Sequence, residues 1–331
     1  MKTGTVAALA CCCCVLVLSL AGAEAPGGQR RARSEPLALN RGDVVVFAGG
    51  EDVVESQRNG YLEMLLLLNF PAAEVRYRNM GWEGDTVYEQ RRDLNFGSWS
   101  NQLQRVGATI VFAQFGQSES LQGREKLPQF VAAYERLLDT LAAKTRRVVL
   151  LSPTPFEKME PPLRDDPVRT EDLKLYVEAI QVLAKERGFP FVDLFTPLQK
   201  SAGREPRLTR DGMHLSAHGH WLAARETARQ LGQSLEVAKA KMDPKTGALS
   251  PPDFERLRQT ILAKNQLWFD HWRPMNWAFL HGDRVEQPSS HDHRNPKVRW
   301  FPQEMEKFLP LIATKEREAE ELARKLSTNR R

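Results

Sequence analysis

The residues best placed to do chemistry are two adjacent acids, Glu51 and Asp52, which follow directly on an apolar run. The run 43–49 leads into Gly49 and Gly50, as is typical of a strand that is buried on both faces of a parallel sheet. Open α/β sheets place their sites just beyond the carboxyl ends of such strands. Presented there, Glu51 can activate water as a general base if burial raises its pKa. Alternatively, the two acids only stabilise the start of the next helix through its dipole.

Three further segments carry candidate groups at the ends of predicted elements. Their candidate residues are Gly84, Gly116, Ser118, Ser120, Asp211 and His214. Taken alone, the Asp-x-x-His pair also fits a turn with a structural histidine, and Gly84 also fits a tight loop. Ser118 and Ser120 offer hydroxyls as replacement nucleophiles, although most loop hydroxyls have no such role.

The elements that must position these groups alternate along the chain. We predict strands at 43–49, 74–80, 108–115, 147–153 and 191–194, with helices at 55–70, around 130–141, 170–188 and 216–231. The segment from 81 to 104 is expected to be irregular. This alternation implies a three-layer α/β/α sandwich with a parallel five-stranded sheet and right-handed crossovers.

The pattern changes after about residue 240, where we predict helices at 254–272 and 304–326 and no further strands. We interpret this part as a helical C-terminal extension packed on the α/β core. Four tryptophans lie in it, at 268, 272, 277 and 300. They could stack on sugar rings, but packing of the extension on the core is the simpler interpretation. The predicted organisation is a signal peptide (1–23), a linker (24–40), an α/β domain (41–237) and the extension (238–331).

The order and spacing of four motifs resemble the block pattern of the SGNH (GDSL-type) hydrolase family. The motifs are Gly49-Gly50-Glu51, Gly84-Asp85-Thr86, Gly116-Gln-Ser-Glu119 and Asp211-x-x-His214, and the resemblance covers roughly residues 40–235. Residues 264–276 and Glu286-Gln287 also resemble the helical tail of a group of large secreted bacterial members. The resemblance implies an SGNH, flavodoxin-like fold and ester hydrolysis.

The resemblance assigns roles to individual residues. It makes His214 the general base and Asp211 the group that orients it, as acyl transfer requires. Gly84 matches the glycine whose N–H holds the oxyanion, and Gly116 matches the glycine of the third block.

The same alignment shows two departures from the family pattern. Glu51 stands where the family has its serine nucleophile, after Gly50 in place of aspartate, and a shift of one residue would put Asp52 there. Ser118 replaces the oxyanion asparagine. Two functions therefore follow as hypotheses. One is an esterase for small acyl esters, such as acetylated carbohydrate, with an atypical or impaired site. The other is an inactive pseudoenzyme that binds a glycan or a protein partner.

Composition and charge limit the partners and cofactors that the protein is expected to bind. The chain has 331 residues and a net charge of +5 spread along its length, which argues against nucleic-acid binding. We predict no cofactor and no metal. His218 and His220 would point to different faces of a helix, and the pair His291 and His293 lacks an obvious third ligand. The sequence carries no signal of oligomeric state.

The N-terminus reads as a targeting segment. A basic Lys2, an apolar stretch at 6–20 and the small residues 21–23 predict a cleavable signal peptide, with the mature chain starting near Glu24. All four cysteines lie inside this segment, so the mature chain would contain no disulfide and no thiol nucleophile. We therefore expect a secreted or periplasmic protein without an integral membrane span. A lipid anchor at Cys11 is the less favoured alternative.

Overall fold

A five-stranded parallel sheet lies at the centre of the fold. The computed structural model describes residues 37–158, 167–233 and 239–328, so the predicted signal peptide and its cysteines lie outside the described residues. The strands are β1 (Val44–Gly49), β2 (Arg76–Asn79), β3 (Ile110–Gln114), β4 (Arg147–Leu151) and β5 (Phe191–Val192). They lie in the order β2-β1-β3-β4-β5, and every pairing is parallel. The predicted fold class is confirmed.

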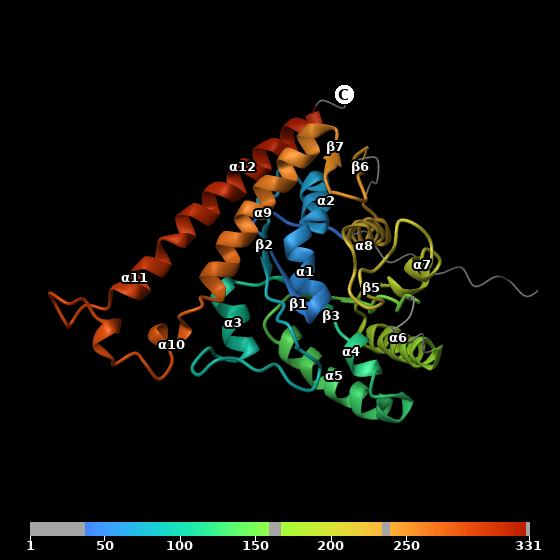
Figure 1. The fold of residues 1–331 in the computed structure, drawn as a ribbon, viewed down its shortest axis with the longest axis horizontal. Coiled ribbons are helices and arrows are strands. Elements are labelled where there is room, and N and C mark those ends of the chain that lie inside the picture. Colours follow the sequence, from blue (N-terminus) through green and yellow to red (C-terminus); the bar gives the residue numbers. More distant parts are fainter. Residues whose placement is uncertain (1–36, 159–166, 234–238, 329–331) are drawn as a thin grey trace, which may run out of the picture. The chain divides into compact units, whose positions relative to one another are not determined.

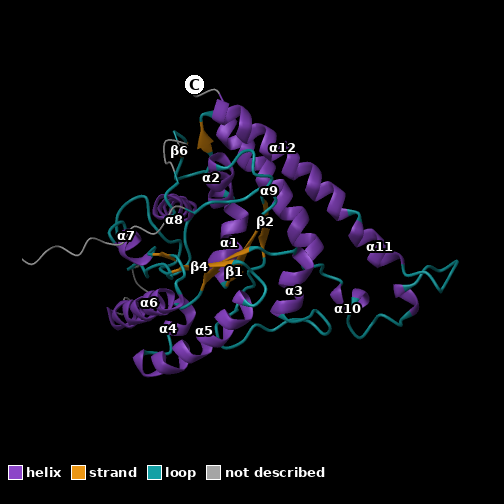
Figure 2. Ribbon diagram, turned by 180° about the vertical axis from the view of Figure 1, so that it is seen from behind, coloured by secondary structure: helices purple, strands orange, loops and turns teal. Residues whose placement is uncertain are grey.

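Helices cover both faces of the sheet (Figures 1 and 2). Side chains of the strands alternate between two cores on these faces. Val45 and Phe47 pack in a first core with residues of α1 (Glu51–Asn59), α2 (Tyr61–Asn69) and α8 (Ala217–Gln230). Val46 and Ala48 pack in a second core with residues of α3 (Trp99–Val106), α5 (Leu127–Ala142) and α6 (Pro167–Arg187). Burial on both faces explains why β1, β3 and β4 read as mostly apolar runs. The shorter helices are α4 (Gln117–Ser120), η1 (Arg124–Lys126) and α7 (Phe195–Gln199).

The C-terminal extension is mostly helical, as predicted. It consists of β6 (Lys241–Met242), β7 (Leu249–Ser250), α9 (Pro252–Trp272), α10 (Trp277–Leu280), η3 (Pro288–Ser290), α11 (Trp300–Glu306) and α12 (Phe308–Thr328). Helices α9 and α12 pack on each other and on α2, and α9 also contacts α1 and the edge strand β2 (Figure 1). None of the described helices is long and apolar enough to cross a membrane.

Several predicted boundaries were wrong for local reasons. The helix expected over 55–70 is two helices, because Gly60 adopts a left-handed φ of 70° between α1 and α2. The segment expected to be irregular up to 104 contains α3, which Ser98 starts with a capping box to Asn101.

Two predictions about the extension also need correction. Strands β6 and β7 form an antiparallel hairpin where none was expected, closed by a turn in which the Gly247 N–H donates to Asp243 O at 2.7 Å. The last helix, expected over 304–326, is divided into α11 and α12 near Lys307.

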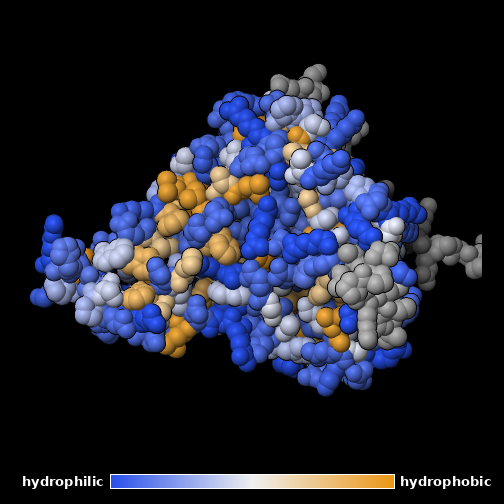
Figure 3. All heavy atoms as spheres, viewed as in Figure 1, coloured by the Kyte–Doolittle hydropathy of each residue, from blue (hydrophilic) through white to orange (hydrophobic). Residues whose placement is uncertain are grey.

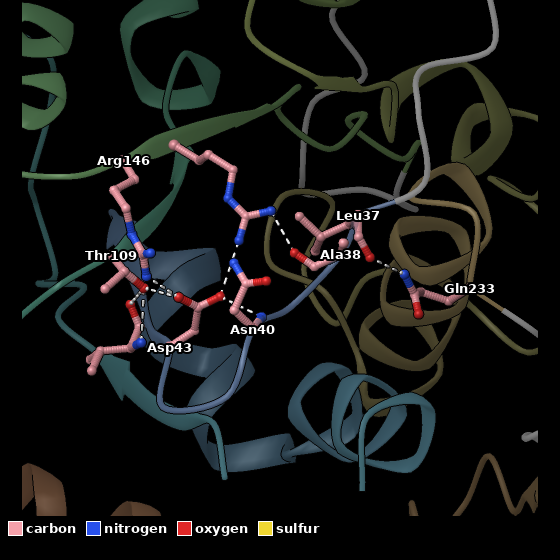
Figure 4. A network of polar contacts seen from close by, with 9 residues as sticks. Leu37, Ala38, Asn40, Asp43, Thr109, Arg146 and Gln233 are labelled. Atoms are coloured by element: carbon pink, nitrogen blue, oxygen red, sulfur yellow. Dashed lines mark hydrogen bonds and ion pairs between the residues drawn. The ribbon is translucent and has the colours of Figure 1, made fainter. Parts of the chain in front are cut away.

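A buried carboxylate closes the amino end of the sheet (Figure 4). Asp43 has no exposed surface and accepts hydrogen bonds from the Asn40 N–H at 2.7 Å and the Thr109 Oγ1 at 2.9 Å. The guanidinium groups of Arg146 and Arg147 pair with its two oxygens. One side chain therefore joins the entry to β1, the entry to β3 and the start of β4.

The tryptophans of the extension mainly serve packing. Trp268, Trp272 and Trp277 are buried in the second core, and the Trp268 Nε1–H donates to Asn79 O at 2.7 Å. Trp300 is 44% exposed. Other exposed apolar side chains of the extension are Met275, Leu309 and Leu311, and Figure 3 shows apolar patches over the C-terminal helices.

A buried ion pair fixes α9 against the α/β core. Lys264 Nζ lies 2.7 Å from Glu63 Oε1 of α2 and also donates to Tyr77 O of β2 at 3.3 Å. Burial raises the pKa of Glu63 and lowers the pKa of Lys264, while each charge counteracts the shift of the other. Removal of one partner would leave the other charge buried alone.

We predict that Lys264→Met lowers the free energy of unfolding by about 3–5 kcal/mol. The double variant Glu63→Gln/Lys264→Met should regain most of this loss, because it leaves no isolated charge. Urea unfolding followed by circular dichroism measures both. Lys325→Met, which removes an exposed partner of Glu321 on α12, is the matched control and should behave like the native chain. A Lys264→Met variant as stable as this control would contradict the prediction.

Candidate functional site

The end of β1 has no room for side chains. A Cβ on Gly49 would lie 2.4 Å from Gln114 O of β3 and 2.5 Å from Val53 Cγ2 of α1. A Cβ on Gly50 would lie 3.0 Å from Asp85 O in the loop after β2. Glycine is therefore required for the close approach of three segments. The turn places Glu51 and Asp52 in the first turn of α1.

A histidine–aspartate pair lies just before α8. Asp211 Oδ2 is 2.6 Å from His214 Nδ1, and Asp211 Oδ1 accepts from the His214 N–H at 2.8 Å. Partial burial would raise the pKa of Asp211, but the hydrogen bonds from the side chain and backbone of His214 lower it below its usual value. The ring of His214 is about 30% exposed, so its other nitrogen can face a substrate or water.

A second buried carboxylate holds the loop that carries this pair. Glu157 accepts from the Thr209 N–H at 2.8 Å, from Thr209 Oγ1 at 2.7 Å and from the Gly203 N–H at 2.8 Å. Thr209 Oγ1 in turn accepts from the Gly212 N–H at 3.0 Å. Ser216 caps α8 by accepting from the Gly219 N–H at 3.1 Å, as predicted. The backbone on both sides of His214 is thereby fixed.

Of the two acids that follow β1, Asp52 has the environment that is more typical of a functional group. Its Oδ2 accepts from Thr154 Oγ1 at 2.7 Å, whereas its Oδ1 is shielded from solvent and has no hydrogen-bond partner. Burial raises the pKa of Asp52 to about 6. The hydrogen bond from Thr154 and the charge of His214 act to lower it, and the charge of Glu51 acts to raise it. The charges of His214 and Glu51 therefore both act on the carboxylate of Asp52.

Glu51 is the first residue of α1 and is half-buried. Gly50 occupies the N-cap position, and no side chain caps the helix. Both acids can therefore interact with the helix dipole, but neither makes a capping hydrogen bond. No side-chain hydrogen bond or ion pair of Glu51 is seen within the described ranges. Its carboxylate is unengaged at the position where the resemblance places a nucleophile.

The candidate oxyanion groups differ in their exposure and in whether they already make hydrogen bonds within the protein. Gly84 has a φ of 79° and is exposed, and Ser118 is exposed in the first turn of α4. Gly116 is buried, and its N–H donates to Glu119 Oε2 at 2.8 Å, so this N–H is already occupied. Ser120 is buried and donates to Gln117 O at 2.7 Å, which makes it unsuited to attack a substrate.

Three residues that connect the site were not singled out from the sequence. Gln117 Nε2 donates to Thr154 O at 3.0 Å and to Met213 O at 3.3 Å, so it joins three loops. Glu119 Oε1 accepts from the Val87 N–H at 2.8 Å, which ties the third block to the loop after β2. With Thr154, they lie in the segments that follow β3 and β4, and a polar residue in the segment after an apolar strand is the signal that could have identified them.

The extension reaches the same edge through Arg273, which follows α9. Its guanidinium lies 3.7 Å from the ring centroid of Trp82 and 2.7 Å from Glu83 Oε2. Asp85 makes a two-pronged ion pair with Arg92, at 2.7 Å for both contacts. The loop that carries Gly84 is therefore held from both sides. No group of three potential metal-ligating side chains occurs among the described residues.

A family model described as the GDSL-like Lipase/Acylhydrolase family matches residues 48–222, more than half of the chain. The chain belongs to this family. The match begins in β1 and ends in α8, so it contains every residue of the candidate site. The predicted family membership is confirmed, and the fold is that of an esterase-like hydrolase.

Individual proteins are similar to this chain over different shares of its length. A GDSL esterase/lipase of Arabidopsis thaliana, CPRD49, is 30% identical over 139 residues, which cover 38% of this chain and 54% of that protein. The chain thus spans about half the length of this curated relative. A gut microbial diltiazem-metabolizing enzyme has a similar structure, with a TM-score of 0.56, 13% identity and coverage of 89% of this chain and 96% of the other. An acetylxylan esterase from Geobacillus stearothermophilus is 18% identical over 60% of this chain and 98% of its own, with a TM-score of 0.45.

The raised pKa of Asp52 predicts a particular pH dependence of stability. Because the folded chain binds this proton more tightly than the unfolded chain, the ionised carboxylate costs stability above pH 6. This cost, on the order of 3 kcal/mol, should disappear as the pH falls from about 6 to about 4. Asp52→Asn should therefore raise the free energy of unfolding at pH 7 to 8 and have little effect at pH 4. Urea unfolding across this range measures the effect, with exposed Asp253→Asn as the control. Equal effects of Asp52→Asn at both ends of the range would refute the prediction.

Proposed function

We propose that the chain is a secreted or periplasmic esterase of the GDSL-like family that hydrolyses small acyl esters, such as acetyl groups on a carbohydrate. The observation that carries the proposal is the 2.6 Å contact between Asp211 Oδ2 and His214 Nδ1. This contact fixes the orientation of the imidazole, which is what a general base needs. The family membership and the esterase relatives support the same class of reaction.

In this proposal water replaces the missing serine as nucleophile. His214 takes a proton from a water molecule, the resulting hydroxide attacks the ester carbonyl, and the histidine returns the proton to the departing alcohol. The donors available to the oxyanion are the N–H groups of Glu51 and Gly84 and the hydroxyl of Ser118. The Glu51 carboxylate opposes the negative charge that develops there, so we expect slow turnover.

The proposal is tested by hydrolysis of p-nitrophenyl acetate by the purified protein. His214→Ala should lower kcat/KM by about 10²-fold or more, since it removes the general base. His293→Ala, which changes an exposed histidine of the extension, should have no effect. If His214→Ala retains the native rate, the proposed base is wrong.

Substitutions at position 51 separate two effects of having glutamate in place of serine, which are the added negative charge and the lost nucleophile. Glu51→Ala should raise kcat/KM modestly, because it removes the opposing charge without adding a nucleophile. Glu51→Ser should raise it further, by about 10²-fold or more, because it restores a hydroxyl at the nucleophile position of the family pattern. A lower rate in Glu51→Ala would instead show that Glu51 takes part as a base.

A second candidate function rests on Glu51 itself. A free carboxylate at the nucleophile position and a serine in place of the oxyanion asparagine suit an inactive relative that binds a glycan or a protein in the old cleft. Native hydrolysis no faster than that of His214→Ala, together with activity in Glu51→Ser, would favour this alternative.

Secretion is proposed on the N-terminal sequence alone. Expression of the full chain in a bacterial host should yield a mature protein that begins near Glu24 in the periplasm or medium. N-terminal sequencing and intact-mass analysis measure this. A protein that keeps residues 1–23, or one that carries a lipid on Cys11, would contradict cleavage at this site.

A further inference from the structure

Three side chains beside the candidate site form a continuous hydrogen-bond network. Thr154 Oγ1 donates to Asp52 Oδ2 at 2.7 Å and accepts from Gln117 Nε2 at 3.0 Å. Gln117 Nε2 also donates to Met213 O at 3.3 Å. We call Asp52, Thr154 and Gln117 the Thr154 network. Thr154 lies at its centre and has no exposed surface, so water does not compete for the bonds of its hydroxyl.

The Thr154 network reaches three segments that each carry a residue of the candidate site. Asp52 directly follows the nucleophile position in the first turn of α1. Gln117 directly precedes the oxyanion position in α4. The carbonyl group that Gln117 contacts belongs to Met213, which directly precedes His214. The network therefore joins the three groups whose relative positions acyl transfer depends on.

The chemistry of the three side chains fixes the direction of these hydrogen bonds. An ionised Asp52 can only accept, so the Thr154 hydroxyl gives its one proton to the carboxylate and accepts from Gln117. The reversed amide would place Gln117 Oε1 against the carbonyl oxygens of Thr154 and Met213, which also only accept. Each member therefore has a single arrangement that satisfies the others, as is typical of a network that holds a site rigid.

Other hydrogen bonds around His214 lie within its own loop. Asp211 Oδ1 accepts from the His214 N–H, and the Arg210 N–H donates to His214 O at 2.9 Å. Such bonds fix the shape of the loop but not its position relative to α1. Glu157 ties the loop to the segment after β4. An ion pair at 3.3 Å joins Arg210 to Glu55 of α1, but the Arg210 side chain is 49% exposed, so this contact contributes little.

We propose that Asp52, Thr154 and Gln117 are positioning residues, which hold the loop of His214 in a fixed place relative to positions 51 and 118. In the proposed reaction none of the three attacks the ester, takes a proton or holds the oxyanion, so they act through His214. The effect on hydrolysis rests on the proposed function. The effect on the position of the loop does not, because the hydrogen bonds are present whether or not an ester is cleaved.

Hydrogen exchange followed by mass spectrometry tests the effect on the loop. Gln117→Met keeps the length of the side chain but removes its donors, and it should speed exchange of residues 209–215 about tenfold, as expected for the loss of one hydrogen bond. Thr154→Val should act in the same direction, because it frees the Gln117 amide. Thr154→Ser keeps the hydroxyl and should exchange like the native protein. Thr227→Val is the matched control, since it removes a similarly buried hydroxyl that donates to Ala223 O within α8.

The kinetics of p-nitrophenyl acetate hydrolysis test the effect on catalysis. Gln117→Met and Thr154→Val should lower kcat about tenfold or more and leave KM within about twofold, because misplaced groups slow the chemical step more than they weaken binding. Thr154→Ser should restore kcat, and Thr227→Val should keep the native values. Thr154→Val leaves the buried Asp52 without its donor. If this variant does not fold, Gln117→Met decides the test, since it leaves no charge without a partner.

The two measurements separate failure of this proposal from failure of the proposed function. The proposal is overturned if residues 209–215 exchange in Gln117→Met as they do in the native protein, whatever the rate of hydrolysis. It is also overturned if exchange is faster while kcat is unchanged. If the native protein shows no hydrolysis that depends on His214, the proposed function fails, and the exchange of the loop alone then decides whether the network positions it.

Discussion

The constraint on which the site depends is the absence of a side chain at Gly49. At this residue β1 passes so close to β3 and α1 that a single Cβ would meet Gln114 O at 2.4 Å and Val53 Cγ2 at 2.5 Å. The chain must therefore turn immediately into α1, with Gly50 packed against Asp85 O of the neighbouring loop. This close packing fixes the direction in which the first turn of α1 starts. Any residue at position 51 is delivered to the carboxyl edge of the sheet, whether it is a nucleophile or not.

Buried carboxylates give this edge its rigidity. Glu119 joins the loops after β2 and β3 by accepting from two backbone N–H groups, and Glu157 fixes the loop before α8 in the same way. Burial raises the pKa of Glu119, whereas the several hydrogen bonds to Glu157 outweigh its burial and lower its pKa. Neither carboxylate touches the atoms that would do chemistry. The framework of an esterase site can therefore persist when the nucleophile is replaced, because the ties that hold it do not involve position 51.

The fold could be predicted from the sequence because β1, β3 and β4 are mostly apolar runs that are buried on both faces of the sheet, and such runs have few other structures available to them. The family motifs also placed Asp211 and His214 in one loop, and the structure brings their side chains together. Other features depend on contacts that no local pattern encodes. Thr154 meets Asp52 across 102 residues of sequence, so the burial that raises the pKa of Asp52 could not be foreseen. The break at Gly60 and the start of α3 at Ser98 did have local signals, in a left-handed glycine and a capping box. At Gly60 the apolar periodicity of the surrounding segment favoured one continuous helix. At Ser98 the polar composition of the segment favoured an irregular structure.

The C-terminal extension is part of the same structural unit as the candidate site and is not a separate domain. Arg273 stacks on Trp82 and pairs with Glu83, while Trp272 contacts Trp82 and Phe96 in the second core. The loop after β2 has only the short helix α3 and few backbone hydrogen bonds of its own, so these contacts supply the order that its sequence lacks. Gly84 is exposed at a positive φ within that loop. An N–H group that must hold an oxyanion is useful only if its position is fixed beforehand. In the proposed esterase the extension would act on catalysis without contacting the substrate, because it fixes the loop that carries Gly84.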